Sequence, residues 1–181
     1  MSTTTDKQQQ PLRWGILSAG KISYDFCVAL STLPSTDHKV VHVAARNADK
    51  AKQFATTFDI PRWSDGDGYA SLVGDRDVDV VYVGAINTTH KELCLLCFEH
   101  GKPVLCEKPA TMNGRELEEV LVKAKEKNIF YMEVCLKFLC LYYVSRKCSI
   151  NAFSKVGYRG SLARWAIPCT LDFTGRNNSF S

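Results

Sequence analysis

One lysine follows a short apolar run at a place where a charged side chain could do chemistry. The motif Cys106-Glu107-Lys108-Pro109 comes directly after a stretch that is typical of a buried strand. In parallel sheets, ligands bind outside the carboxyl ends of the strands. A lysine there can hydrogen-bond to an alcohol or carbonyl oxygen and stabilise negative charge on it. Lys108 is therefore a candidate catalytic residue, and the alternative is an ordinary loop lysine.

A second stretch, RWGILSAGKIS at residues 13–23, is typical of a phosphate-binding turn. Its positions Ser18, Gly20 and Ser23 align with the three glycines of the dinucleotide fingerprint, although only Gly20 keeps the glycine. The helix expected after Gly20 would offer free N–H groups and a positive dipole end to a phosphate. An ordinary strand-to-helix turn is the alternative. The residues that we predict to bind the cofactor here are Ser18, Ala19, Gly20, Lys21 and Ile22.

The end of the next apolar run indicates which dinucleotide would bind. NAD-specific sites place Asp or Glu there for the ribose 2′-hydroxyl, but this chain has Ala45 followed by Arg46. A guanidinium attracts a 2′-phosphate. We therefore predict NADP as the cofactor, with Arg46 as its ligand, whereas Arg46 as a solvated surface charge is the alternative.

These loops need a framework, and the first 133 residues supply one by alternating strand-like and helix-like segments. This alternation predicts an α/β fold, a doubly wound parallel sheet that forms a dinucleotide-binding domain. The predicted strands cover residues 12–17, 40–45, 62–64, 78–85, 104–106 and 129–133. The predicted helices cover residues 21–33, 49–58, 67–73, 90–99 and a segment that Asn113 caps and that ends near 127, with Glu116 three residues after the cap.

The motifs together resemble the Gfo/Idh/MocA family of oxidoreductases. The resemblance rests on GILSAGKIS, AARNADKAKQFA, the segment from DVDVVYVGA to LCEKP, and FYMEV, and it covers about residues 12–134. It implies hydride transfer between NADP and a hydroxyl-bearing carbon of a sugar or dihydrodiol substrate, in a family whose full-length members form homodimers.

The resemblance also implies roles for individual residues. Lys108 would stand near the reacting carbon and orient the substrate, and the bond between Lys108 and Pro109 would be cis. Asn87 and His90 would border the cofactor's ribose and nicotinamide. Glu107 would shape the loop or bind ribose hydroxyls.

Composition and the ends of the chain complete these expectations. The 181 residues carry a net charge of +4, which points to no particular partner. We expect a disordered start at residues 1–11, the dinucleotide-binding domain at 12–133, and a divergent basic tail rich in cysteine at 134–181. No signal peptide or long apolar segment is evident, so we expect a cytoplasmic protein with reduced thiols, and neither nucleic acid nor a membrane as partner. For Cys94 and Cys97, buried thiols are favoured over a metal site, and no metal is predicted.

The family's second domain is expected to be missing, because residues 134–181 do not match it. Two hypotheses of function follow. The chain is an NADP-dependent dehydrogenase, or it is a truncated, catalytically inactive NADP-binding isoform or regulatory module.

Overall fold

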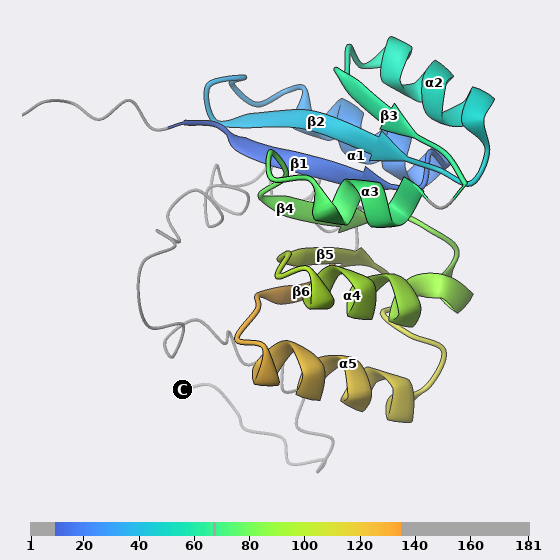
Figure 1. Cartoon of the computed structure of the whole chain (residues 1–181), viewed down its shortest axis with the longest axis vertical. Helices are drawn as coiled ribbons and strands as arrows, with labels where there is room; N and C mark the ends of the chain where they lie inside the picture. The colour runs from blue at the N-terminus through green and yellow to red at the C-terminus, as the bar shows by residue number, and fades with distance from the viewer. Residues whose placement is uncertain (1–9, 67, 135–181) are drawn as a thin grey trace, which may run out of the picture.

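The computed structural model describes residues 10–66 and 68–134, and the predictions for residues 1–9 and 135–181 lie outside the described residues. In this described part, six strands alternate with five α-helices and one 3-10 helix (Figure 1). The strands are β1 (Leu12–Leu17), β2 (His38–Ala44), β3 (Arg62–Ser64), β4 (Val80–Val83), β5 (Val104–Glu107) and β6 (Tyr131–Val134). The helices are α1 (Lys21–Leu30), α2 (Ala48–Thr57), α3 (Gly68–Gly74), η1 (Asn87–Thr89), α4 (His90–Glu99) and α5 (Gly114–Glu126).

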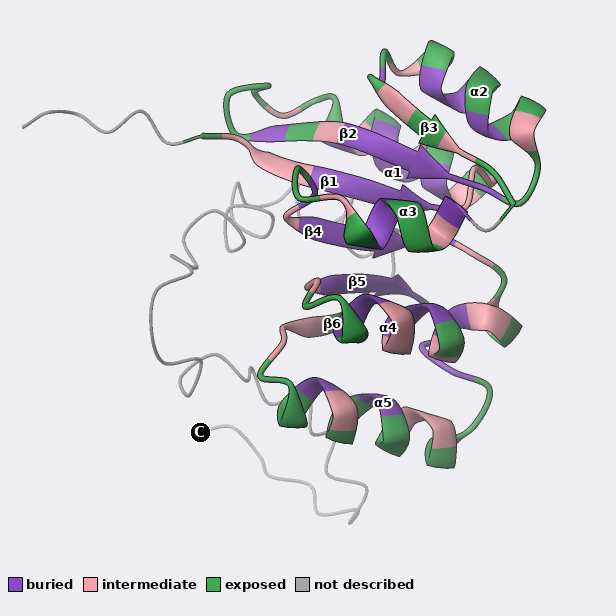
Figure 2. Ribbon diagram, viewed as in Figure 1, coloured by how far each residue is buried: buried purple, intermediate pink, exposed green. Residues whose placement is uncertain are grey.

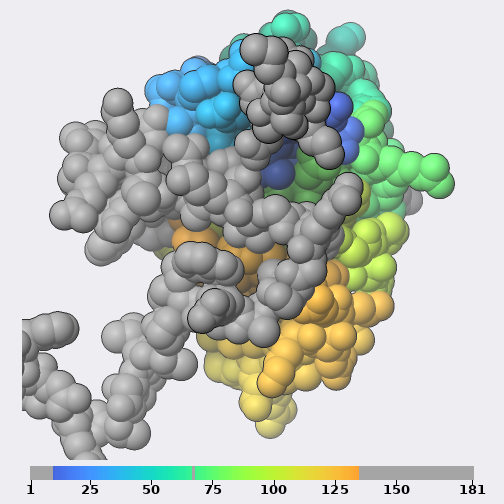
Figure 3. Space-filling model, turned by 90° about the vertical axis from the view of Figure 1, so that its left-hand side faces the viewer, coloured from blue at the N-terminus to red at the C-terminus, as the bar shows by residue number. Residues whose placement is uncertain are grey.

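The strands form one sheet in the order β3-β2-β1-β4-β5-β6, and every neighbouring pair is parallel. This is the strand order of a doubly wound dinucleotide-binding fold, and it confirms the predicted fold class. Figure 3 shows the molecule from another side, with the yellow and orange segments of α5 and β6 at one end and the light-blue and teal segments of β2 and α2 at the other.

Helices cover both faces of the sheet, and a separate core lies on each face. On one face, α3, α4 and α5 pack through residues such as Leu72, Phe98 and Val120. On the other face, α1 and α2 pack through Phe26 and Phe54. The four central strands β2, β1, β4 and β5 are buried along most of their length, whereas the edge strands β3 and β6 are partly exposed (Figure 2). No helix in the described part of the chain has the length and apolar character needed to span a membrane.

Local side-chain chemistry sets the ends of the helices. Asn113 caps α5 as predicted, since its side-chain oxygen accepts a hydrogen bond from Glu116 N at 3.0 Å. The carboxylate of Glu116 accepts from Met112 N at 3.1 Å rather than from the capping residue itself. The predicted extension of the first helix to residue 33 is wrong, because α1 ends at Leu30. There the hydroxyl of Ser31 donates to the carbonyl oxygen of Val28, which competes with helical bonding.

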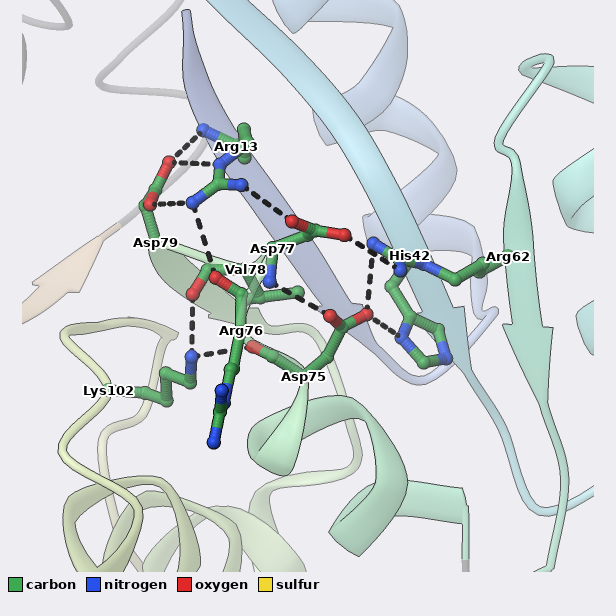
Figure 4. A network of polar contacts seen from close by, with 9 residues as sticks. All are labelled: Arg13, His42, Arg62, Asp75, Arg76, Asp77, Val78, Asp79 and Lys102. Atoms are coloured by element: carbon green, nitrogen blue, oxygen red, sulfur yellow. Dashed lines mark hydrogen bonds and ion pairs between the residues drawn. The ribbon is translucent and has the colours of Figure 1, made fainter.

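A cluster of ion pairs fixes the amino edge of the sheet (Figure 4). The Arg13 guanidinium on β1 binds both carboxylate oxygens of Asp79 at 2.8 and 2.9 Å, a two-point contact that also sets orientation. Arg62 on β3 contacts Asp75 and Asp77 at 3.1 and 2.9 Å. The turn that precedes β4 is therefore held by side chains from β1 and β3.

The buried imidazole of His42 joins this cluster from β2, because its Nδ1 lies 2.9 Å from an Asp75 carboxylate oxygen. Burial lowers the pKa of His42, although Asp75 works against that change. Lys102, which precedes β5, donates to the carbonyl oxygens of Asp75 and Val78. Side chains on or next to every strand from β1 to β5 thus converge on a single turn.

The close approach of α1 to β4 depends on Gly84. A Cβ atom added at residue 84 would lie 2.2 Å from Ser23 Oγ and 2.7 Å from Tyr82 Cε1. We therefore predict that Gly84→Ala lowers the free energy of unfolding by about 1–3 kcal/mol, the range for overpacked cores. Gly74→Ala is the matched control, because nothing lies within 4 Å of the added Cβ there. Urea unfolding of both variants tests this, and equal stabilities would contradict it.

Candidate functional site

The parallel sheet brings the candidate residues to its carboxyl edge. Ser18 follows β1, Arg46 follows β2, Asn87 follows β4 and Lys108 follows β5. β1 pairs with β2 on one side and with β4 on the other, so the strand order reverses at this point, which is where ligands bind in sheets of this kind. Residues that are 90 positions apart in the chain thus share one edge.

The turn after β1 keeps the backbone shape of a phosphate-binding turn without its first glycine. Ser18 has a φ of +83°, a conformation that favours glycine, and its N–H donates to the carbonyl oxygen of Ala44 at 2.8 Å. Gly20 is the N-cap of α1 and provides no side-chain cap. The first N–H groups of α1 are thus left without an intrahelical or capping partner, as an anion site requires.

The environment of Gly20 shows why a glycine suits a ligand-binding position. A Cβ at residue 20 would meet only Ser18 Oγ at 3.7 Å and the Gly84 carbonyl oxygen at 3.8 Å, which are ordinary contacts. The protein itself therefore does not require glycine there. Close approach of a ligand to the backbone is a physical reason for it, so this turn fits a dinucleotide phosphate.

Arg46 is exposed beyond the end of β2, whereas the preceding Ala45 is buried. Sequence reasoning missed its neighbour, the half-buried Tyr69 of α3. Burial raises the pKa of the Tyr69 hydroxyl, and the charge and backbone of Arg46 oppose that rise. Tyr69 comes just after the glycines of SDGDG, a segment interpreted only as a loop, and only the fold reveals that it lies beside Arg46.

The loop that carries Lys108 is held by buried hydrogen bonds while Lys108 itself is exposed. The peptide bond between Lys108 and Pro109 is cis, as the family resemblance predicts. The Glu107 side chain is buried and accepts from the Tyr82 hydroxyl at 2.9 Å and from Lys108 N at 3.2 Å. Two roles are expected for Glu107. These contacts fit the first, shaping the loop, and a contact of Glu107 with a ribose stays a prediction.

Asn87 and His90 occupy different environments in the connection after β4. Asn87 is half-buried at the start of η1. His90 is the first residue of α4 and is only 1% exposed. Its ring nitrogens lie 2.8 Å from the carbonyl oxygen of Pro109 and 2.9 Å from that of Ala85. The ring thus joins two loops of the site, and a contact of His90 with a cofactor stays a prediction.

The cysteines of α4 point into the protein, as expected for buried thiols. Cys94, Cys97 and Cys106 are all free and fully buried. Among the described residues, no group of three or more His, Cys, Asp or Glu side chains is arranged to hold a metal ion.

Comparison with known proteins identifies relatives of this domain. Residues 12–134 match the oxidoreductase family GFO_IDH_MocA, described by its NAD-binding Rossmann fold. The trans-1,2-dihydrobenzene-1,2-diol dehydrogenase of Xenopus tropicalis is 50% identical over 121 residues, which are 67% of this chain and 36% of that protein. The enzyme of the same name from Danio rerio is 45% identical over 147 residues, 80% of this chain and 43% of that protein.

A solved structure supports the same relationship. KijD10, a 3-ketoreductase from Actinomadura kijaniata in complex with NADP and TDP-benzene, superimposes with a TM-score of 0.63 at 31% identity, covering 68% of this chain and 37% of that one. This chain thus spans between 36% and 43% of the length of these three relatives.

The positive φ of Ser18 gives a prediction for the phosphate turn. A non-glycine residue in this conformation carries a strain of about 1–2 kcal/mol, which glycine would relieve. Glycine also loses more backbone entropy on folding, and this cancels about 0.5–1 kcal/mol of the relief. We therefore expect Ser18→Gly to raise the free energy of unfolding by up to about 1 kcal/mol. Asp59→Gly, at a φ of +52° after α2, is the control and should also stabilise the fold. A loss of stability confined to Ser18→Gly in thermal unfolding would show that its hydroxyl holds the turn.

Proposed function

Because the chain belongs to the GFO_IDH_MocA oxidoreductase family, we propose that residues 12–133 form an NADP-binding unit of a dehydrogenase that acts on a sugar or a dihydrodiol. The observation that supports this most directly is that the turn after β1, Arg46 after β2 and Lys108 after β5 all lie at the carboxyl edge of the same parallel sheet. The bound cofactor would supply the hydride acceptor, and the chain's own residues bind the cofactor and orient the substrate.

The turn from Ser18 to Ile22 holds the cofactor's pyrophosphate in this proposal. The uncapped N-terminus of α1 directs backbone N–H groups and the positive end of the helix dipole at the phosphates. The lack of any tight contact for a Cβ at Gly20 leaves room for a close approach of the ligand. Asn87, in the connection after β4, contacts the ribose and nicotinamide side of the cofactor.

The preference for NADP rests on charge at the end of β2. An acidic residue that would repel a 2′-phosphate is replaced by Ala45, and the exposed Arg46 supplies a guanidinium that attracts it. Tyr69 lies next to Arg46. KijD10, the structural relative above, was solved with NADP.

Lys108 acts on the substrate in this proposal. It is exposed at the same edge. The buried Glu107 side chain accepts a hydrogen bond from the backbone N–H of Lys108 and so fixes the loop. Its ammonium group donates a hydrogen bond to the hydroxyl oxygen at the reacting carbon and stabilises negative charge that develops there. We propose a dihydrodiol as one substrate because the relatives from Xenopus tropicalis and Danio rerio are named for it. The activity of the whole protein is part of this proposal.

The cofactor preference predicts a selective effect of one substitution. Arg46→Ala should weaken NADPH binding by about 1–3 kcal/mol, the scale of a hydrogen bond to a charged group, and leave NADH binding nearly unchanged. Fluorescence titration with both cofactors measures this. Arg76→Ala is the control, because that exposed arginine lies at the opposite edge of the sheet. An equal loss for NADPH and NADH would contradict a 2′-phosphate contact.

The role of Lys108 predicts a split between binding and turnover. Lys108→Met should keep its NADPH affinity within about twofold but lower dehydrogenase turnover at least about a hundredfold, as expected when a charge-stabilising donor is removed. The assay uses trans-1,2-dihydrobenzene-1,2-diol and D-xylose with the 181-residue chain. NADPH binding without turnover in the unsubstituted chain would favour the NADP-binding module instead.

A further inference from the structure

The ring of His90 occupies a position between the two loops that carry the other site residues. Ala85, whose carbonyl oxygen lies 2.9 Å from Nε2, belongs to the connection that leads to Asn87. Pro109, whose carbonyl oxygen lies 2.8 Å from Nδ1, follows Lys108 directly. The ring therefore bridges the connection after β4 and the loop after β5.

The chemistry of imidazole restricts how these two contacts can form. A neutral ring carries one N–H, and its other nitrogen is an acceptor, whereas the protonated ring donates from both nitrogens. Carbonyl oxygens are acceptors only, so a neutral ring would place a lone pair against one of them within 3 Å. A buried carbonyl oxygen left without a donor costs about 1–3 kcal/mol. The two distances together thus favour the protonated ring.

The surroundings of the ring contain a partner for its positive charge. Burial lowers the pKa of His90, but Cys106 of β5 and the two carbonyl groups raise it overall to about 9. A hydrogen bond from Cys94 of α4, together with a hydrogen bond and the positive charge of His90, lowers the pKa of Cys106 to about 6 against the effect of burial.

Two more titratable groups of β6 face this cluster. Glu133 opposes ionisation of Cys106 through its negative charge, and its carboxylate accepts from Ala110 N at 2.9 Å. Burial raises the pKa of Tyr131, and the neighbouring Cys94 and Cys106 raise it as well. Of these groups, Cys106 is the one that raises the pKa of His90 through a side-chain hydrogen bond and through its charge.

We propose that His90 is a positioning residue whose protonated ring donates to Ala85 and Pro109 at once and so holds the loop of Lys108 against the loop of Asn87. The proposal goes beyond a cofactor contact, because the ring acts through the two loops. Only the reason for holding the two loops together, which is the binding of NADP and substrate, rests on the proposed function. Loss of the proton removes one of the two hydrogen bonds and releases one loop, so the arrangement is present at neutral pH and is lost as the pH rises through about 9.

The protonation state is tested directly in the unsubstituted 181-residue chain by nuclear magnetic resonance with nitrogen-15-labelled histidine. We expect both ring nitrogens of His90 to carry protons at about pH 7.5. His42 and His38 should be neutral in the same sample, because burial lowers the pKa of each. His90→Gln assigns the signal, and His100→Gln, at an exposed residue after α4, provides the assignment control. A single proton on the His90 ring at this pH would overturn the proposal.

The consequence for the site is tested by NADPH titration between about pH 7 and pH 10. His90→Gln should weaken binding about tenfold at pH 7, which corresponds to one charge-assisted hydrogen bond. It should also remove the part of the pH dependence that the unsubstituted chain shows near pH 9. Identical pH profiles for both proteins would overturn the positioning role. Absence of NADPH binding by the unsubstituted chain at every pH would instead contradict the proposed function, and the ring protons would still decide the state of His90.

Discussion

The parallel pairing of β1 with β2 on one side and β4 on the other determines where every candidate residue lies. Because all strands point the same way, each strand's carboxyl end delivers its following loop to the same edge. Such strands are buried on both faces and need helices on each side. The two cores, around Phe98 and around Phe26, meet that need. The chemistry of the carboxyl edge is thus a consequence of how the centre of the sheet is paired.

The two edges of the sheet are held by different interactions. At the amino edge, partly exposed charges converge on the turn from Asp75 to Asp79, and Arg13 fixes it through a two-point contact. At the carboxyl edge, buried and partly buried hydrogen bonds hold the loop around Lys108, as between Tyr82 and Glu107. Exposed ion pairs weaken with salt, whereas buried hydrogen bonds do not. The side of the molecule that needs a fixed geometry for chemistry is thus held by the interactions that salt weakens least.

Patterns in the sequence predicted the elements well because the interactions that form elements are local. The apolar run around Val80 to Val83 indicates a strand buried on both faces, and Asn113 indicates the start of a helix. The contacts that position the site are not local. Tyr82 and Glu107 are 25 residues apart, and His90 contacts a carbonyl group 19 residues away. No periodicity encodes such pairs, so sequence reasoning placed His90 at the correct edge without finding what its ring contacts.

The turn after β1 shows why a fingerprint of glycines can be altered without loss of its shape. What a phosphate requires is a backbone that turns sharply and presents N–H groups, and glycine is the residue that adopts this backbone at least cost. Ser18 adopts it with a φ of +83°, at a strain of about 1–2 kcal/mol. Two backbone hydrogen bonds hold the turn in this state, one from Ser18 N to Ala44 and one from Gly84 N to Leu17. Strain of this kind persists only where the surroundings determine the conformation, and here the neighbouring strands β2 and β4 do so.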